Sequence, residues 1–245
     1  MTKVIVLAAG LGKRMGGKIP KVLISLAGKP MIKYLVEAIK KSGVDRRPTV
    51  VVASDSKNLI KQTLNGCDYV VQKKQLGTGH AVACTRDFLQ NKTENILVLY
   101  GDHPLVSAET IKKLNQAHLR EKKVLTMAVV KIPDFNGWRK SFYDFGRVIR
   151  KRNGQISQII EKKDALPAQL KIKEVNPSYF CFKADWLWQN LNKLKNNNAQ
   201  QEYYLTDFVE IACRQNQEIA TVQIEPREAL GVNTPKQLKL ISKLF

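Results

Sequence analysis

The stretch Lys3–Gly16, KVIVLAAGLGKRMG, carries an apolar run that stops abruptly at glycines. Its first part has the composition of a buried strand, and Gly10 and Gly12 follow where the chain must turn. Glycines at such a turn let backbone N–H groups lie close to an anion. The spacing matches neither the dinucleotide-binding glycine motif nor the Walker loop. The turn alone is therefore compatible with an anion site or with a plain tight turn.

Strand-like and helix-like segments alternate through the first half of the chain. The expected strands are residues 3–8, 49–53, 69–72 and 96–100, and the expected helices are residues 31–42, 57–64, 80–89 and 107–119, the last capped by Ser107. This alternation is typical of β-α-β units with right-handed crossovers. The sequence therefore predicts an α/β fold around a mostly parallel central sheet.

The second half of the chain is less regular. We expect a strand at residues 124–131, a polar and aromatic loop at 132–145, strand-like pieces around 148, 156–160 and 174–182, and helices at 186–194, 206–216 and 236–244. No stretch has the composition of a linker. The prediction is one α/β domain over residues 1–245, with a small mixed lobe inserted on the substrate side.

The charge of the chain is strongly basic, with 41 Lys and Arg against 21 Asp and Glu, a formal net charge of +20. Such an excess attracts nucleic acid, anionic membranes or polyphosphate ligands, or it is simply a solvated basic surface. Zinc-finger spacing and an aromatic RNA-binding signature are both missing from the sequence, so we expect no nucleic-acid partner.

Cysteine spacing and hydropathy bear on the cellular compartment. Cys67, Cys84, Cys181 and Cys213 are widely scattered, as expected of reduced thiols rather than a zinc site or a disulfide framework. The opening apolar run is too short for a signal peptide, and no stretch reaches the roughly 18 apolar residues of a membrane span. We therefore expect a cytoplasmic protein without membrane insertion.

Cations surround the opening turn. Arg14 can bind a phosphate through two nitrogens, and Lys13 adds positive potential beside it. Further on, Pro20 fixes the backbone just before Lys21 in the segment KIPKVL. Lys21 is either a positioned phosphate ligand or one more surface lysine of a basic protein.

A second glycine loop, QKKQLGTGHAV at residues 72–82, leads directly into a helix. Gly77, Thr78 and the helix N-terminus place N–H groups and a hydroxyl where they can contact a base edge or an anion. The amide of Gln72 offers both a donor and an acceptor, which suits a pyrimidine edge. His80 has no evident catalytic partner in the sequence, and we expect it to pack.

The apolar strand in LVLYGDHPL, residues 97–105, ends at Gly101 and Asp102. In open parallel sheets, the carboxyl ends of the strands face the ligand. Asp102 is therefore either the cap of the following helix or a ligand of a divalent cation such as Mg²⁺, which takes one or two protein oxygens and completes its shell with phosphates and water.

Six segments occur in the order found in one enzyme family: LAAGLGKRM, PKVL, QLGTGHAV, YGDHPL, IIEKKDA and NNNAQQEYYLTD. The chain resembles the nucleotide-sugar pyrophosphorylases over nearly its whole length. Within them it is most similar to the uridyltransferase domain of the bifunctional N-acetylglucosamine-1-phosphate uridyltransferase/acetyltransferases. The resemblance implies a Rossmann-like nucleotidyltransferase fold with helices on both faces of the sheet. It also implies a nucleotide-binding half at about 1–123, a sugar-phosphate-binding half at about 124–233 and a closing helix at 234–245.

The same resemblance implies roles for individual residues. The nucleotide-binding positions are Leu7, Ala8, Ala9, Gly10, Gln72, Gly77, Thr78, Tyr100 and Gly101. The catalytic positions are Arg14, Lys21 and Asp102, and the protein ligands of Mg²⁺ are Asp102 and Asn233. The sugar-binding positions are Gly146, Glu161, Asn176, Glu202, Tyr204 and Thr206. From its sequence context alone, Glu161 could equally form a surface ion pair with Lys162 or Lys163.

The activity implied by the resemblance is a Mg²⁺-dependent transfer of uridylyl from UTP to a sugar 1-phosphate, by default N-acetylglucosamine 1-phosphate. Attack on the α-phosphorus in line with the leaving pyrophosphate needs no protein nucleophile, so catalysis consists of positioning and charge stabilisation. The alternatives are the same chemistry on another sugar 1-phosphate, such as a glucose or galactosamine derivative, and a nucleotide-sugar-binding regulatory protein without turnover.

Three features depart from the family pattern. The chain ends at Phe245, where the bifunctional enzymes continue into a β-helix, so we expect neither acetyltransferase activity nor a trimer made by that element. The loop before Gly146 is longer than in the family and brings Phe135, Trp138, Phe142 and Tyr143 either onto the sugar or into a hydrophobic plug. Asn176 is followed by Pro177 and Ser178 where the family has Thr and Gly, and Pro177 removes a backbone donor.

Overall fold

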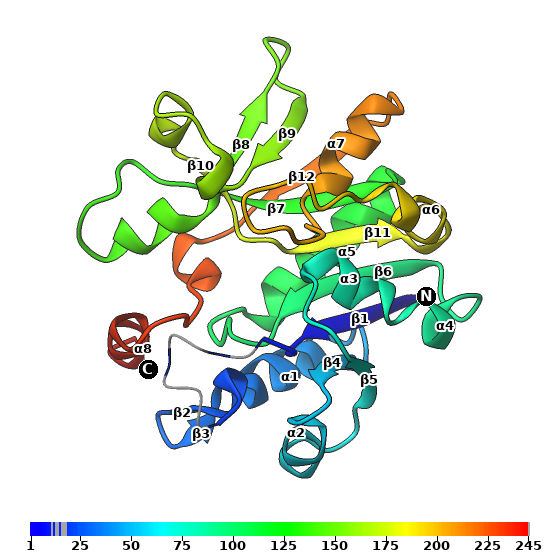
Figure 1. The fold of residues 1–245 in the computed structure, drawn as a ribbon, viewed down its shortest axis with the longest axis vertical. Coiled ribbons are helices and arrows are strands. Elements are labelled where there is room, and N and C mark those ends of the chain that lie inside the picture. Colours follow the sequence, from blue (N-terminus) through cyan, green and yellow to red (C-terminus); the bar gives the residue numbers. More distant parts are fainter. Residues whose placement is uncertain (11, 13–14, 16–18, 245) are drawn as a thin grey trace.

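The structure is a computed structural model that describes residues 1–10, 12, 15 and 19–244 (Figure 1). Within these residues it forms one ten-stranded sheet in the order β5-β4-β1-β6-β11-β7-β10-β8-β9, with β12 paired to β7, and a separate hairpin of β2 and β3. The strands of the sheet are β1 Thr2–Leu7, β4 Thr49–Ala53, β5 Asp68–Gln72, β6 Asn95–Tyr100, β7 Leu125–Lys131, β8 Gly146–Arg150, β9 Ile156–Ile160, β10 Glu174–Asn176, β11 Phe180–Lys183 and β12 Ile219–Gln223. The hairpin consists of β2 Ser25–Leu26 and β3 Lys29–Pro30.

The first four strands of this order are parallel, and their register aligns the carboxyl ends. Leu7 at the end of β1 pairs with Val51 of β4 and with Tyr100 at the end of β6. Gln72 at the end of β5 pairs with Ala53 at the end of β4. The glycine turn, the second glycine loop and the Gly101–Asp102 corner therefore all begin at one edge of the sheet.

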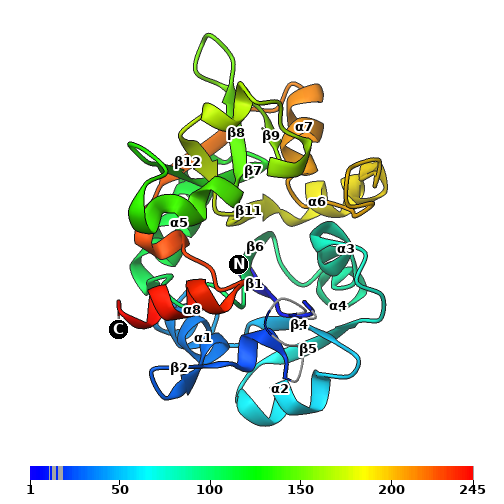
Figure 2. The ribbon, with the colours of Figure 1, turned by 60° about the vertical axis from the view of Figure 1, so that its left-hand side comes forward.

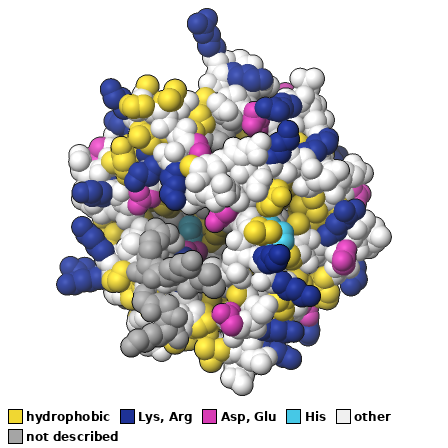
Figure 3. Space-filling model, in the orientation of Figure 1, with side chains coloured by type: hydrophobic (Ala, Val, Ile, Leu, Met, Phe, Trp, Pro, Cys, Tyr) yellow, Lys and Arg dark blue, Asp and Glu magenta, His cyan; other side chains and the backbone are white. Residues whose placement is uncertain are grey.

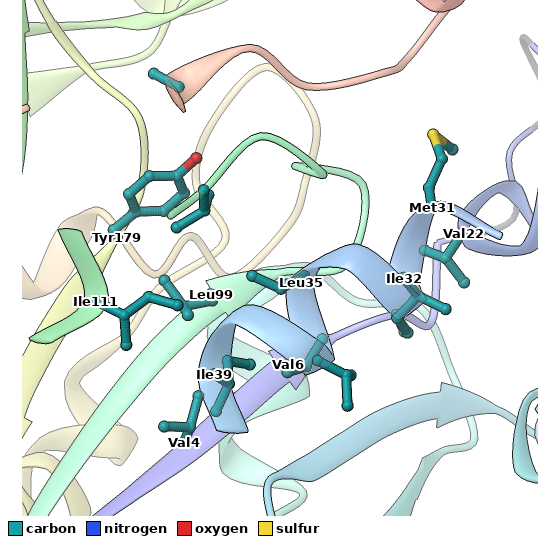
Figure 4. Close-up of a cluster of buried hydrophobic side chains, with 14 of the residues drawn as sticks. Val4, Val6, Val22, Met31, Ile32, Leu35, Ile39, Leu99, Ile111 and Tyr179 are labelled. Atoms are coloured by element: carbon teal, nitrogen blue, oxygen red, sulfur yellow. The ribbon is translucent and has the colours of Figure 1, made fainter. Parts of the chain in front are cut away.

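Helices cover both faces of the sheet, as the sequence predicts (Figures 1 and 2). They are α1 Met31–Ser42, α2 Lys57–Thr63, α3 Thr78–Ala83, α4 Arg86–Leu89, α5 Ala108–Glu121, α6 Ala184–Asn190, α7 Asp207–Arg214 and α8 Pro235–Ser242. Alternate residues of β1 point to opposite faces, so Val4 and Val6 pack under α1 and α5, whereas Ile5 and Leu7 pack with α3 and α4. Figure 4 shows the first of these two cores, where β1 and β6 meet α1 and α5.

The second half of the sheet is mixed. β11 runs antiparallel between β6 and β7, and β10 and β8 continue antiparallel from β7. The prediction of an α/β fold with a mostly parallel centre is confirmed. The lobe expected in the second half begins as a continuation of the same sheet.

Several elements differ from the sequence-based expectation. The single helix expected at 80–89 is two helices, α3 and α4. β12 was missed; only Val222 in it is buried, and the strand joins the sheet by pairing with the distant β7. The hairpin of β2 and β3 has two residues per strand and was also missed. The segment expected as a loop at 132–145 contains a 3-10 helix at Gly137–Asp144. Among the residues that the structure describes, no helix is long and apolar enough to cross a bilayer.

His118 at the end of α5 gives the fold a defined pH dependence. It is buried, with Nδ1 2.9 Å from the Thr126 hydroxyl and Nε2 3.1 Å from Asn95 Oδ1. Burial lowers the pKa of this imidazole from 6.5 to about 4. As the pH falls below 6.5, His118 therefore becomes protonated in the unfolded chain, whereas in the folded chain it stays neutral until about pH 4. Protonation thus favours the unfolded state in this range.

We predict that His118 removes up to about 3 kcal/mol of stability as the pH falls from 6.5 to 4, and nothing above 6.5. Urea unfolding of the wild type and of His118→Asn at several pH values measures this contribution as the difference between the two pH profiles. If the stability of the two proteins changed with pH in the same way, the lowered pKa of His118 would be contradicted.

Candidate active site

A cavity of about 460 Å³ opens at the carboxyl edge of the parallel strands. The face shown in Figure 3 is hollowed near its centre, where acidic and histidine side chains are visible, while Lys and Arg are scattered around it. The lining residues are Leu7, Ala8, Ala9, Gly10, Lys21, Val22, Gln72, Gln75, Gly77, Thr78, Ala81, Tyr100, Asp102, His103, Asp144, Phe145, Gly146, Glu161, Asn176, Pro177, Ser178, Gln200, Glu202 and Asn233.

Most residues predicted for the site lie on this cavity; of the described ones, Gly101, Tyr204 and Thr206 are not among its lining residues. Arg14, like Lys13, lies outside the described residues. Gly101 donates its N–H to the Leu7 carbonyl at 2.9 Å. A Cβ at Gly101 would come within 3.1 Å of Val22 and 3.2 Å of the Leu7 oxygen, so this glycine lets the ends of β1 and β6 approach.

The loop that follows β5 is held by backbone contacts with the segment around Tyr203. Gly77 has φ +106°, and a Cβ there would lie 2.6 Å from the Tyr203 carbonyl oxygen. The Gly79 N–H donates to that carbonyl at 2.8 Å, and Tyr203 donates back to Leu76 at 2.8 Å. The Thr78 hydroxyl accepts from the Leu205 N–H at 3.0 Å. The loop is therefore fixed to the second half of the chain.

Gln72 is oriented within this loop. Its side-chain amide donates to the Gly77 carbonyl at 3.1 Å and lies 3.0 Å from Nδ1 of His80. Both amide hydrogens are thereby used, and Oε1 has no hydrogen-bond partner among the described residues. His80 does not line the cavity, and its contact with Gln72 gives it a positioning role.

Lys21, Asp102 and Asn233 meet at one point. The Lys21 ammonium bonds to Asp102 Oδ2 in a very short contact and donates to Asn233 Oδ1 at 2.8 Å. The side chains of Lys21 and Asp102 are only 14% and 10% exposed, so the alternative of a free surface lysine is wrong. The alternative of a helix cap is also wrong for Asp102, because Ser107 caps α5 by accepting from the Thr110 N–H.

Backbone contacts bring Asn233 to this point. The Val232 N–H donates to the Asp102 carbonyl at 2.9 Å, and the Asn233 N–H donates to Gln237 Oε1 at 2.8 Å. Burial acts to raise the pKa of Asp102, but the nearby Lys21 ammonium and His103 lower it, and the net pKa lies below its ordinary value. The carboxyl group is thus ionised and available to a cation.

His103 is a cavity residue that the sequence reasoning missed. Its Nδ1 lies 2.6 Å from the buried Tyr179 hydroxyl, which donates to the Glu228 carbonyl at 2.9 Å. Because a carbonyl only accepts, the Tyr179 proton is used there and Nδ1 of His103 must donate. Nε2 faces Asp102 at 3.8 Å. The signal available in the sequence was the histidine that directly follows Asp102.

The opposite wall contains Glu161 and Gly146. A Cβ at Gly146 would lie 3.3 Å from Glu161 Oε1, so the glycine makes room for this carboxylate. Glu161 accepts from the Thr206 hydroxyl at 3.2 Å, whereas Lys162 pairs with Asp144 and Lys163 with Gln200. The alternative of a surface ion pair is therefore wrong for Glu161. Burial raises the pKa of its carboxyl group.

The segment after Asn176 forms a closed turn. The Ser178 N–H donates to Asn176 Oδ1 at 2.9 Å, and Asn176 Nδ2 donates to the Ser178 hydroxyl at 3.1 Å. Ser178 has φ +67°, a conformation that favours glycine, which is the residue the family pattern has here. Pro177 and Ser178 both line the cavity, so the departure from the family pattern lies at the site itself.

The segment that carries Glu202 is organised by Asn198. Asn198 accepts from the Glu202 N–H at 3.2 Å and donates to the Glu202 carbonyl at 2.6 Å. Gln200 lines the cavity and donates to the Tyr204 hydroxyl at 2.9 Å. Tyr204 and Thr206 therefore act on the cavity through Gln200 and Glu161.

The long aromatic loop forms a hydrophobic plug. Phe142 is fully buried, and Trp138 and Phe145 pack edge-to-face against it. None of Phe135, Trp138, Phe142 and Tyr143 lines the cavity; Phe145 does. The stacking alternative is therefore not supported for the four aromatics.

Arg147 anchors this plug from within. The guanidinium is completely buried, donates to the carbonyls of Phe145 and Tyr143, and lies 5.0 Å from the ring centroid of Phe135. Burial lowers the pKa of Arg147. Carbonyl dipoles and aromatic faces stabilise the charge of Arg147, and these contacts hold the loop that ends at Gly146.

The donor set at the Lys21 contact fits a hard divalent cation. Asp102 Oδ2 and Asn233 Oδ1 already share one cation, the Lys21 ammonium, so both oxygens point to a common position. One carboxylate and one amide oxygen leave most positions of Mg²⁺ for phosphates and water, as this ion prefers. Among the described residues, no group of three or more His, Cys, Asp or Glu side chains could enclose a metal.

The fold and the cavity define the class of α/β nucleotidyltransferases. Residues 4–199 match the family described as the MobA-like NTP transferase domain, and the chain belongs to that family. The sequence-based prediction of a nucleotidyltransferase is thus confirmed.

Two similar relatives are bifunctional GlmU proteins. The chain is 39% identical over 239 residues to the one from Caldicellulosiruptor saccharolyticus, covering 96% of this chain and 50% of the relative. It is 38% identical over 241 residues to the one from Clostridium tetani, covering 98% of this chain and 51% of the relative. The chain thus spans about half the length of these relatives.

A solved structure shares the fold. A Bacillus anthracis protein assigned as a glucose-1-phosphate thymidylyltransferase, crystallised with sucrose, superposes with a TM-score of 0.78 at 17% identity, covering 100% of this chain and 95% of that one. This similarity confirms the Rossmann-like fold.

Gly77 offers a test of the loop geometry. We predict that Gly77→Ala lowers the free energy of unfolding by about 3 kcal/mol or more, because backbone strain adds to a clash with Tyr203. The matched control is Gly154→Ala, where φ is +83° but nothing lies within 4 Å, so we expect strain alone, about 1–2 kcal/mol. Urea unfolding measures both. Equal losses would show that the contact with Tyr203 is not tight in solution.

Proposed function

We propose that this chain catalyses the Mg²⁺-dependent transfer of uridylyl from UTP to a sugar 1-phosphate, releasing pyrophosphate. The observation that chiefly supports the proposal is the convergence of Lys21, Asp102 and Asn233 at a cavity that has glycine-rich loops on one wall and Glu161 on the other. Membership of the nucleotidyltransferase family supports the class of reaction. N-acetylglucosamine 1-phosphate is the default acceptor, from the family resemblance.

The orientation of Gln72 suits the N3–H of uracil. Since its amide hydrogens are used by Gly77 and His80, the group left for a base is the acceptor Oε1. The N3–H of uracil can donate to this oxygen, whereas N3 of cytosine only accepts. Gly77 and Thr78 lie on the same wall and complete the proposed base site.

The phosphates would lie along the turn that follows β1. The segment Leu7–Gly10 lines the cavity beside Lys21, and Gly10, which has no side chain, would let an anion approach the backbone closely. Asp102 and Asn233 would hold Mg²⁺, which when bound supplies positive charge to the phosphates. Lys21 would neutralise charge that develops on the leaving pyrophosphate. Arg14 is proposed for the same task on the family pattern alone.

The acceptor would lie between Glu161, Gly146, Asn176 and Glu202. A phosphate oxygen of the sugar 1-phosphate attacks the α-phosphorus as the bond to pyrophosphate breaks, so no proton needs to be removed by the protein. The work of this wall is to hold sugar hydroxyls in line with that attack. The partly buried Glu161 carboxyl group, bonded to Thr206, is the strongest hydroxyl-binding group proposed there.

One observation favours an acceptor other than the N-acetylated sugar. Asn176 uses Oδ1 and one of its two amide hydrogens on Ser178, and Pro177 has no N–H to offer. An acetamido group would therefore find fewer partners than the family pattern provides. A glucose or galactosamine derivative is the second candidate acceptor.

Pyrophosphate release with Mg²⁺ tests the function. We predict release with UTP and one sugar 1-phosphate in a panel that crosses UTP, CTP, ATP and GTP with the 1-phosphates of glucose, N-acetylglucosamine and galactosamine derivatives. Release with CTP but not UTP would contradict the role of Gln72. Tight UTP binding without release for any acceptor would instead support a binding protein without turnover.

Two variants test the proposed catalytic groups. We predict that Lys21→Ala and Asp102→Ala each lower kcat at least about 100-fold, because each removes charge stabilisation at the phosphates. Lys29→Ala, which breaks an exposed ion pair with Glu37, is the matched control and should keep the wild-type rate. Circular dichroism checks that the variants fold. Wild-type rates in both site variants would remove this mechanism.

A further inference from the structure

The position shared by Asp102 Oδ2 and Asn233 Oδ1 carries a cation of the chain itself. The Lys21 ammonium bonds to both oxygens, 2.8 Å from Asn233. Both Lys21 and Asp102 are largely shielded from water, with side chains 14% and 10% exposed. A buried pair of this kind is not a loose surface contact, and it occupies the same lone pairs that a metal would need.

An ammonium and a divalent ion cannot use these oxygens together. Mg²⁺ requires its oxygens at about 2.1 Å, and two cations sharing one carboxylate and one amide would lie within a few ångströms of each other. Because the side chains of Lys21 and Asp102 are largely shielded from water, this repulsion is weakly screened. Binding of a metal between Asp102 and Asn233 therefore requires that the Lys21 ammonium leaves.

The surroundings allow the ammonium to move while the backbone stays. Lys21 starts the 3-10 turn Lys21–Leu23, in which the Leu23 N–H donates to the Pro20 carbonyl at 2.9 Å. Gly12 lies so near that a Cβ there would come 2.9 Å from Lys21 Cβ. The four-carbon side chain, by contrast, can rotate about its own bonds. The segment Leu7–Gly10, along which the phosphates are proposed to lie, lines the same cavity.

We propose that Lys21 is an exchangeable counter-ion, which holds the Asp102–Asn233 position against divalent metal until a triphosphate draws the ammonium onto its phosphates. The inference rests on the proposed nucleotide and metal sites. It adds an order to binding: the free protein binds metal weakly, and nucleotide and metal bind cooperatively. By linkage, the metal must strengthen nucleotide binding by the same factor.

The direct test measures Mn²⁺ binding to the full chain without nucleotide. The electron paramagnetic resonance signal of free Mn²⁺ gives the amount that remains unbound. We expect Lys21→Met, which keeps the length of the side chain and removes its charge, to bind Mn²⁺ at least fivefold more tightly than the wild type. Lys3→Met removes another partly buried lysine paired with a carboxylate, Asp45 at 3.1 Å, and should leave the affinity unchanged. Adding Asp102→Asn to Lys21→Met should abolish the gain.

Equal or weaker Mn²⁺ binding by Lys21→Met overturns the proposal. If that variant does not fold, Lys21→Gln serves in its place, and the wild type gives an independent reading. In ¹⁵N-lysine NMR, the Lys21 ammonium signal should shift on saturation with Mg²⁺; an unchanged signal under saturating Mg²⁺ also overturns the proposal.

These readings are separate from the proposed function. Tighter Mn²⁺ binding by Lys21→Met together with no pyrophosphate release from any triphosphate would support the exchange and refute the transferase. Pyrophosphate release by the wild type, together with an unchanged Mn²⁺ affinity of Lys21→Met, would support the transferase and refute the exchange.

Discussion

The contact among Lys21, Asp102 and Asn233 is the constraint on which the rest of the site depends. The lysine lies 81 residues before the aspartate and 212 before the asparagine, so the contact joins the two ends of the chain. Parallel strands supply part of the reason, because β1 and β6 end side by side at Leu7 and Tyr100. The backbone bond from Val232 to Asp102 supplies the rest, since it returns the last segment to the end of β6.

The two walls of the cavity are built by different means. The wall with the glycine loops depends on close backbone approach: Gly101 against Leu7, and Gly77 against Tyr203. The opposite wall depends on side chains, with Glu161 bonded to Thr206 and the plug anchored by Arg147. A wall made of backbone suits the invariant phosphates of a nucleotide, whereas a wall made of side chains can change its acceptor by substitution. Pro177 and Ser178 lie in that second wall.

The sequence predicted the elements that carry strong local signals. The helix at 31–42 and the strand at 49–53 were expected with the bounds that the structure has, and Ser107 caps α5 as expected. β12 was missed because it is mostly half-exposed and joins the sheet by pairing with the distant β7. The position of β11 between β6 and β7 also depends on long-range pairing that no local pattern contains.

The same distinction applies to the site. Motif resemblance predicted most lining residues, including Asn233, which is far from the others in sequence. It did not predict the Lys21 bridge, the bond of His103 to Tyr179, or the capture of the Gln72 amide by Gly77 and His80. These contacts depend on side-chain directions at the cavity, which sequence order does not specify. The aromatic loop shows the same limit, because its residue types suited a sugar and a plug equally.

We infer that Asp102 and Asn233 form a cation site that faces phosphates on the turn after β1. Anomalous diffraction at the manganese edge, from crystals grown with Mn²⁺ and the non-hydrolysable α,β-imido analogue of UTP, tests it most directly. We expect one manganese peak about 2.1 Å from Asp102 and Asn233 oxygens, with the analogue's phosphates along Leu7–Gly10 and the Lys21 ammonium on a phosphate. Manganese held away from both side chains, or an analogue bound outside this cavity, would contradict it.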